Sequence, residues 1–212
     1  TMRNENEDYN AAVQGLSCIG NVAIVRSGDA KGARGFVTGK HGGCEHLLCY
    51  FDPETLEKMS IGDTIDVRTQ GQGMKLLDYP EILLRNMSPA LLEKMNITEK
   101  DGKLTVACKD RSGLGASTSY YGDYDITLHD KQICQQYGLD QLRFGDIVAI
   151  QDADTRYGRN FITGAITIGV VVHSDCILSG HGPGVTTLMT CKTPLIEPVI
   201  DQSANLADFF LK

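Results

Sequence analysis

The sequence lacks tryptophan altogether, and none of its seven cysteines forms a Cys-x-x-Cys pair. That absence gives no support to a zinc ribbon or to a dithiol redox motif. The odd number and scattered positions of the cysteines are typical of free thiols in a reducing compartment, so we expect a cytoplasmic protein. Basic residues are in the minority, and the net charge of −7 argues against a general nucleic-acid surface.

Long hydrophobic runs are missing as well. No apolar stretch approaches the roughly 18 residues that a helix needs to cross a bilayer, and the first residues do not have the pattern of a signal peptide. We therefore expect no membrane association. Hydrophobic residues still make up 42% of the 212 residues and charged residues 22%, which is the composition of an ordinary globular protein with a core.

What the sequence has in quantity is glycine, with 23 residues between many short apolar runs. This combination favours strands and tight turns, and we predict a mainly β fold with short helices, of the β-rich α+β class. An apolar-Gly-Asp phrase followed by alternating β-branched residues occurs twice, at 61–67 and 144–150. The repetition predicts two β-barrel or sandwich units, which we place at residues 1–70 and 71–212, packed closely on each other.

The short helices are marked by their caps. Asp52 and Ser88 each precede a proline at the first helical position, which is a strong start signal. A third helix is expected between Asp130 and Gly138, because aspartate caps helix starts and glycine favours helix ends. Residues 203–212 have the pattern of a capped amphipathic helix.

Two polar segments are predicted to be loops. Residues 111–123 are rich in Gly, Ser and Thr but lack the Gly-Lys-Ser/Thr ending of a P-loop, so we expect a plain long loop rather than an anion site. Residues 152–159 begin with Asp-x-Asp, as calcium loops do, but Arg156 stands where an EF-hand needs an oxygen ligand. We interpret this second segment as a solvated loop whose charges pair with one another.

Residues 28–37 have the pattern Gly-x-x-Lys-Gly-x-x-Gly-x-Val and resemble the KOW motif, a strand-loop-strand element of SH3-like barrels in ribosomal and transcription proteins. The glycines permit positive φ in the tight turn, and the flanking apolar residues pair across it. We interpret the match as SH3-like barrel geometry within residues 1–70. A KOW-type RNA-binding or ribosome-associated module is an alternative that the acidic balance and the lack of interleaved aromatic residues disfavour.

Four of the five histidines fall in two short segments, 41–46 and 173–181. The glycines after His41 exclude the helix that a His-Glu-x-x-His zinc site needs, but ligands on strands and loops can converge at irregular spacing. For any single histidine, a hydrogen bond to a backbone carbonyl is the simpler explanation. For the two segments together we predict a site for a divalent metal, with His41, Glu45, His46 and His173 as ligands.

The second histidine segment follows a run, 166–172, that has the pattern of a buried strand. Asp175 and His181 are candidate acid/base groups at the strand exit. The Gly-Pro-Gly turn that follows offers backbone amides for a developing oxyanion, because its glycines allow a ligand or another backbone to come close. We therefore predict that four residues bind substrate: Gly182, Gly184, Thr186 and Thr187.

The first residue offers a different nucleophile. An N-terminal threonine can attack a substrate with its own α-amino group as base, so Thr1 is a candidate if internal cleavage of a longer precursor exposes it. An N-terminal fragment of the same precursor would then be a partner. The simpler explanation is a cloning remnant ahead of Met2.

Several long phrases resemble a bacterial family, domain of unknown function 4438. They are His41-Gly-Gly-x-Glu45-His46, the segment from His173 to Thr187, and, upstream, 17–21 and 28–32. The similarity extends from about Leu16 to the C-terminus. The resemblance implies a β-rich fold with barrel and sandwich parts, and members with a longer N-terminal region. It implies no established reaction.

From these residues we predict a hydrolase of small amide-type substrates, which uses a His/Asp pocket with either a metal-activated water or Thr1 as nucleophile. The alternatives are a non-catalytic protein that binds a small-molecule ligand and the KOW-type module described above. We also expect a homo-oligomer.

Overall fold

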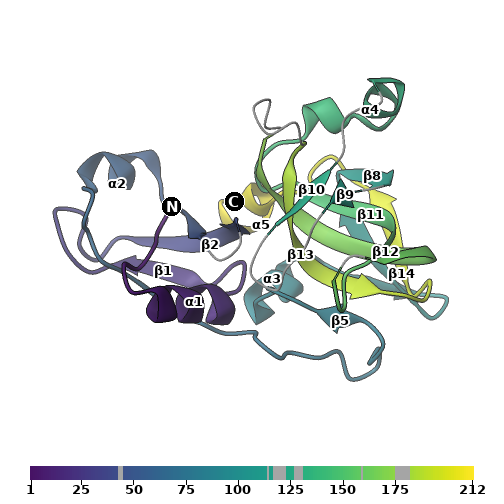
Figure 1. The fold of residues 1–212 in the computed structure, drawn as a ribbon, viewed down its shortest axis with the longest axis horizontal. Helices are drawn as coiled ribbons and strands as arrows, with labels where there is room; N and C mark the ends of the chain where they lie inside the picture. Colours follow the sequence, from purple (N-terminus) through teal and green to yellow (C-terminus); the bar gives the residue numbers. More distant parts are fainter. Residues whose placement is uncertain (43–44, 114, 117–122, 127–130, 159, 175–181) are drawn as a thin grey trace.

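The computed structural model describes residues 1–42, 45–113, 115–116, 123–126, 131–158, 160–174 and 182–212. Figure 1 shows a smaller N-terminal part, with β1, β2, α1 and α2, beside a larger part built on β10 to β13. The C-terminal helix α5 (Leu206–Phe210) lies between the two, next to β2. The predicted mainly β fold with short helices is confirmed.

The N-terminal part is a four-stranded antiparallel sheet in the order β3-β2-β1-β4. Its strands are β1 (Val22–Val25), β2 (Arg34–His41), β3 (His46–Tyr50) and β4 (Ile65–Val67). Strands β1 and β2 pair across residues 26–33, so the glycine-rich segment has the predicted strand-loop-strand form. Its relationship to the KOW motif stays a prediction.

Two helices accompany this sheet. Helix α1 (Glu7–Leu16) begins at Asn6, whose side chain accepts a hydrogen bond from the Tyr9 amide. Helix α2 (Pro53–Lys58) begins after Asp52, which accepts from the Thr55 amide at 2.9 Å. This confirms the cap that the Asp-Pro signal predicts, since such a bond satisfies one of the free amides of the first turn.

The larger part contains a seven-stranded sheet in the order β8-β11-β12-β13-β10-β9, with β5 paired to β13. The strands are β5 (Leu83–Leu84), β8 (Asp110–Gly113), β9 (Gly115–Ala116), β10 (Tyr124–Ile126), β11 (Ile147–Asp154), β12 (Asn160–His173) and β13 (Gly184–Cys191). Strands β8 and β11 are parallel, and the other pairs are antiparallel.

A three-stranded sheet and short helices complete this part. The sheet has the order β14-β7-β6, with β6 (Thr98–Lys100), β7 (Lys103–Cys108) and β14 (Ile196–Ile200). The helices are α3 (Pro89–Lys94), α4 (Lys131–Tyr137) and the 3-10 turn η1 (Leu139–Gln141). Gly138 separates α4 from η1 with φ of 64°, a left-handed conformation that glycine adopts without strain.

Three expectations need correction. The segment 111–123 is not a plain loop, because β8 runs to Gly113 and β9 follows it. The segment 152–159 is only partly a loop, since β11 continues through Asp154, although its charges do pair, with Arg156 Nε 2.8 Å from Asp154 Oδ1. Strand β12 begins six residues before the apolar run 166–172; its first five residues, 160–164, are exposed or only half-buried, so they have no continuous apolar pattern that marks them as strand.

A network of buried hydrogen bonds joins the two parts. The Thr186 hydroxyl donates to the Lys40 carbonyl at 3.1 Å and lies 3.2 Å from the Lys40 amide, which donates to it. Lys40 Nζ, fully buried, donates to Asn86 Oδ1 at 2.7 Å, and Asn86 Nδ2 donates to the Thr187 carbonyl at 3.1 Å. Because unpaired polar groups are costly in a core, these bonds fix β2 against β13.

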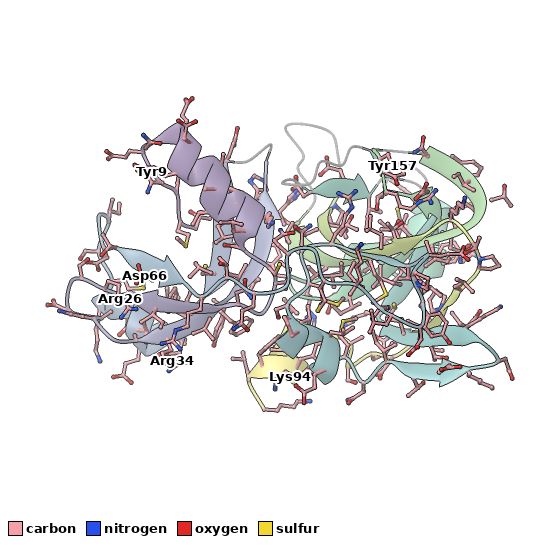
Figure 2. The ribbon with its side chains drawn as sticks, turned by 90° about the horizontal axis from the view of Figure 1, so that it is seen from below. Tyr9, Arg26, Arg34, Asp66, Lys94 and Tyr157 are labelled. Carbon is pink, nitrogen blue, oxygen red and sulfur yellow. The ribbon has the colours of Figure 1, made fainter. Side chains whose placement is uncertain are left out.

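Helix α5 adds an aromatic contact between the parts. The Phe210 ring stacks on Phe36 of β2, with 4.7 Å between ring centroids. Lys94 of α3 donates to the Phe209 carbonyl at 2.8 Å and lies 5.3 Å from the centre of the Phe210 ring. Figure 2 shows Lys94 beside this helix.

Within the described residues, no helix combines the length and the apolar character that crossing a membrane requires. The division at residues 1–70 and 71–212 stays a prediction.

Candidate metal centre

Three neighbouring strands place one row of residues at the end of the seven-stranded sheet. Gly184 of β13 pairs with His173 of β12 on one side and with Asp125 of β10 on the other. Residues that lie in register across adjacent strands point to the same face of a sheet. The imidazole and the carboxylate therefore flank a position that has no side chain.

Gly184 is needed for the contacts above it. A Cβ atom at this position would lie 2.1 Å from His173 Nε2 and 2.6 Å from Asp123 Oδ2. Both separations are shorter than any normal contact, so any other residue would push these groups apart. The glycine thus opens the space in which the two side chains meet.

The two carboxylates meet the same imidazole nitrogen. His173 Nε2 lies 2.9 Å from Asp123 Oδ2 and 3.2 Å from Asp125 Oδ1. The three side chains are partly shielded, with exposed fractions of 17%, 13% and 22% for His173, Asp123 and Asp125. At this burial a pair of carboxylates requires a nearby positive charge.

The other nitrogen of His173 faces the backbone. Nδ1 lies 2.6 Å from the Ser174 carbonyl, and the Gly184 amide lies farther away at 3.3 Å. The shorter contact requires a proton on Nδ1, which donates to the carbonyl. This arrangement is typical of metal-binding histidines, because such a bond fixes the orientation of the ring and presents Nε2 to the ion.

His41 approaches from the other part of the molecule. It is the last residue of β2, and its ring meets His173 edge-on with 5.0 Å between centroids. Lys40 precedes His41, and the hydrogen bonds between Thr186 and the Lys40 backbone hold β2 next to β13 at this point. The same hydrogen bonds therefore position His41 over the row of His173, Gly184 and Asp125.

His41, Asp123 and His173 form a group in which one ligand atom from each lies within 4.8 Å of the others. A zinc ion binds nitrogen and oxygen ligands at about 2.0–2.2 Å, so small side-chain shifts complete such a site. Two imidazoles and one carboxylate suit zinc, manganese and ferrous iron. Asp125 beside His173 supplies a second carboxylate that can ligate or act as a base.

The close contacts between His173 and the carboxylates shift the pKa values of these groups. The hydrogen bond to Asp123 raises the pKa of His173 from 6.5 to about 9, with burial opposing the shift and the Ser174 carbonyl and both carboxylates supporting it. For Asp123, burial favours a higher pKa, but the hydrogen bond from His173 and the positive charges of His173 and His41 outweigh it and lower the pKa. The site therefore has a strong preference for a cation, which a proton or a metal ion can satisfy.

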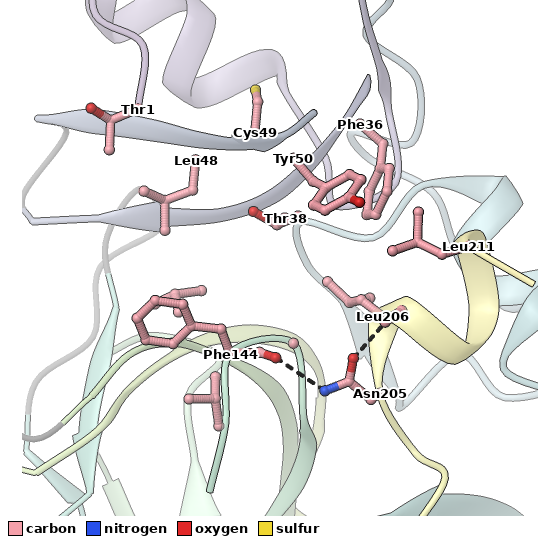
Figure 3. Close-up of a pocket in the computed structure, with 14 residues that line it drawn as sticks. Thr1, Phe36, Thr38, Leu48, Cys49, Tyr50, Phe144, Asn205, Leu206 and Leu211 are labelled. Atoms are coloured by element: carbon pink, nitrogen blue, oxygen red, sulfur yellow. Dashed lines mark hydrogen bonds between the residues drawn. The ribbon is translucent and has the colours of Figure 1, made fainter. Parts of the chain in front are cut away.

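An apolar cavity of about 400 Å³ lies between the N-terminal sheet and the segments that contain Phe144 and Leu206 (Figure 3). Leu48, Tyr50 and Phe36 of the N-terminal sheet line one wall, and Phe144 and Leu206 lie opposite. The cavity also contacts Val172, the residue before His173.

The structure brings together only part of the predicted ligand set. His41 and His173 share the group above, whereas Glu45 and His46 lie outside it. His46 neighbours His41 across β2 and β3, with 6.3 Å between ring centroids, and its Nε2 lies 4.0 Å from Glu45 Oε2. All four assignments as metal ligands stay predictions.

The remaining predicted site residues have different surroundings. Gly182 is buried just before β13, and Thr186 and Thr187 are buried in it, where Thr186 bonds to the Lys40 backbone. Thr1 lines the apolar cavity, apart from the histidine group. The predicted acid/base residues Asp175 and His181 lie outside the described residues.

Sequence reasoning missed Asp123 and Asp125. Asp123 is the last residue of the glycine-rich segment that we interpreted as a loop, and Asp125 lies two residues after it. A signal was present, because Asp-Tyr-Asp-Ile has the alternation of a strand that presents both carboxylates on one face.

Two family models together cover nearly the whole chain. Models for the N-terminal and C-terminal parts of a domain of unknown function, DUF4438, match residues 1–93 and 94–210. The crystal structure of TM1086 is similar, with 45% sequence identity and a TM-score of 0.89 over 98% of this chain and 75% of that chain. No curated protein matches significantly. The chain therefore belongs to the DUF4438 family.

Proposed function

We propose that the protein is a metal-dependent hydrolase of small amide-type substrates. His41, Asp123 and His173 hold a divalent ion, and Asp125 serves as the general base. The observation that carries the proposal is the convergence of two carboxylates and two histidines from three separated segments, over a glycine that leaves room for them. A bound divalent ion supplies Lewis-acid chemistry, which polarises a carbonyl and lowers the pKa of water.

The residues of the chain perform the proton transfers. Asp125 takes a proton from water as the water oxygen forms a bond to the amide carbon. The C–N bond then breaks, the same proton passes to the departing nitrogen, and the products are a carboxylic acid and an amine. Asp125 is close enough for this role, since its Oδ1 lies 3.2 Å from His173 Nε2, the nitrogen that would bind the ion.

Asp175 and His181 remain candidates for a second acid/base group. Thr1 as nucleophile is the weaker version of the proposal, because Thr1 lies in the cavity wall and not in the histidine group. A non-catalytic metal-binding protein is the alternative that the same geometry supports.

The test begins with metal content. We expect the chelator-treated protein to take up one equivalent of Zn²⁺, Mn²⁺ or Fe²⁺, counted by mass spectrometry after desalting. His173→Ala and Asp123→Ala should each abolish this uptake, because a three-ligand site does not survive the loss of one ligand. His46→Ala is the matched control, since His46 neighbours His41 but lies outside the group.

Activity is the second measurement. The metal-loaded protein should release amine from a panel of small N-acyl amides, and chelation or Asp125→Asn should abolish the release. Stoichiometric metal without hydrolysis would favour the non-catalytic alternative. Absence of metal uptake, or equal loss of uptake in His46→Ala, would overturn the proposed centre.

A further inference from the structure

The apolar cavity shares a sheet face with the proposed metal centre. His41 pairs with His46, and Gly39 pairs with Leu48, across β2 and β3. The intervening pair, Lys40 and Leu47, is fully buried on the opposite face. Since side chains alternate along a strand, His41 and Leu48 point to the same side, one pair apart, which is about 7 Å along the strand.

Strand β12 provides a second connection. A Cβ atom at Gly39 would lie 2.2 Å from Val172 Cγ1, so β2 touches β12 immediately before His173. Val172 and Leu48 both line the cavity. The cavity therefore reaches the chain neighbour of His173 on β12, although His41, Asp123 and His173 are not among its described lining residues.

The cavity lining is suited to an apolar group. No side chain among its described lining residues carries a charge. The Asn205 side chain is already used, because its Nδ2 donates to the Phe144 carbonyl and to Asp146, and its Oδ1 accepts from the Ala207 amide. Aromatic and aliphatic side chains form most of the wall, and about 400 Å³ is within the range of small-ligand pockets.

We infer that this cavity is the acyl subsite of the proposed hydrolase and that the substrate class is amides of an apolar carboxylic acid. The inference rests on the proposed function. The scissile carbonyl lies at the histidine group, and an aromatic or medium-length aliphatic acyl group extends from it between Leu48 and Phe144. Short, polar or charged acyl groups would leave the apolar walls exposed to water and bind weakly.

The test uses two probe series, straight-chain carboxylates and straight-chain hydroxamates from two to eight carbons, titrated calorimetrically against zinc-loaded protein. Each buried methylene should tighten binding about fourfold until the cavity is full. Hydroxamates should bind more tightly than carboxylates of equal length, because they chelate the ion. His173→Ala should remove this hydroxamate advantage and retain the dependence on chain length.

Two variants locate the apolar part. Phe144→Ala should weaken the longer probes about tenfold or more and leave the two-carbon probes unchanged. Phe161→Ala is the matched control, because Phe161 is exposed to a similar degree, 68% against 66%, and lies near the opposite end of β12. Neither substitution removes a buried side chain, so both variants should fold.

The outcomes separate the inference from the proposed function. Metal uptake with binding that ignores chain length would overturn the acyl subsite and leave the metal centre standing. Dependence on chain length that Phe144→Ala abolishes, without metal uptake, would support the apolar subsite and overturn the metal centre. Equal losses in Phe144→Ala and Phe161→Ala would overturn the subsite.

Discussion

Two groups of carboxylates, Asp146 alone and the pair Asp123 and Asp125, lie at the same end of the seven-stranded sheet. A lysine faces the first group and a histidine faces the second. Asp146 is fully buried next to β11, and its carbonyl accepts from the Val171 amide, two residues before His173. Its carboxylate accepts from Asn205 Nδ2 and from the Arg143 amide, both at 2.7 Å, and lies 3.5 Å from Lys109 Nζ. Asp123 and Asp125 instead pair with His173.

The difference separates a structural cluster from a candidate site. The Asp146 cluster is complete without any ligand, because its carboxylate accepts two hydrogen bonds and lies next to the Lys109 ammonium group. An imidazole can release its proton and bind a metal ion through the same nitrogen. The cluster around His173 can therefore exchange its cation, whereas the cluster around Asp146 cannot.

The largest expected effect concerns the structural cluster. Asp146→Ala should lower the free energy of unfolding by about 3–5 kcal/mol, because it leaves the partly buried Lys109 without its ion-pair partner and the buried Asn205 amide without its acceptor. Urea unfolding measures this change, and metal uptake of the folded fraction should be unaffected. Asp123→Asn should show the reverse pattern, with metal uptake lost and stability nearly retained. Similar behaviour of both variants would remove the distinction between the clusters.

The next effect concerns the glycine under the site. Gly184→Ala should weaken metal binding about 10-fold to 100-fold, since the added Cβ displaces His173 and Asp123 from their contact. Gly35→Ala is the control, because its Cβ would also clash, at 2.8 Å from Phe51 Cδ1, but near the opposite end of β2 from His41. It should reduce stability without changing the metal dissociation constant. Unaltered metal affinity in Gly184→Ala would show that the row does not position the ligands.

A smaller effect should appear in the pH dependence of the metal-free protein. The pKa of His173 is raised from 6.5 to about 9, so its protonated form stabilises the fold fully below about pH 6.5 and this stabilisation is lost as pH rises through about 9. The pKa of Asp123 is lowered, so its ionised form stabilises the fold above the ordinary pKa of an aspartate, and this stabilisation is lost only in acid.

Chemical unfolding at pH 6 and pH 9.5, in the presence of chelator, measures this effect. Between pH 6 and pH 9.5, the free energy of unfolding of the wild type should fall by on the order of 1–2 kcal/mol more than that of His173→Gln. An equal loss in both proteins would assign the change to other groups.

The smallest effect should come from an exposed ion pair. Arg26 Nε lies 2.6 Å from Asp66 Oδ2, but the side chains are 49% and 60% exposed, and Figure 2 shows them at the surface of the N-terminal part. Arg26→Ala should change stability by less than about 1 kcal/mol, because water screens such pairs. A larger loss in thermal or urea unfolding would mean that distance, and not burial, ranks the ionic contacts of this protein.

Local signals in the sequence were sufficient for many elements. Capping bonds at Asp52 and Ser88 follow directly from side-chain chemistry within three residues, and both helices begin where these caps predict. The buried half of β12 was visible as an apolar run for the same reason. Its exposed half was not visible, because an exposed hairpin has no burial pattern in its sequence.

The candidate site was harder because it depends on long-range register. His41 and His173 were identifiable as unusual residues, but the sequence could not show that Gly184 lies between His173 and Asp125. Asp123 and Asp125 gained significance only from that row. Conversely, Glu45 and His46 share a segment with His41, yet their side chains are not part of its group.

The position of His41 has a consequence for how the protein matures. Its imidazole belongs to the first family segment, whereas Asp123 and His173 belong to the second. In the proposed centre, a chain whose halves have not yet docked would offer at most two of the three donors, so tight metal binding would follow assembly. Once bound, the ion would link ligands from both halves and oppose their separation. Metal occupancy would then report whether an individual molecule has finished folding.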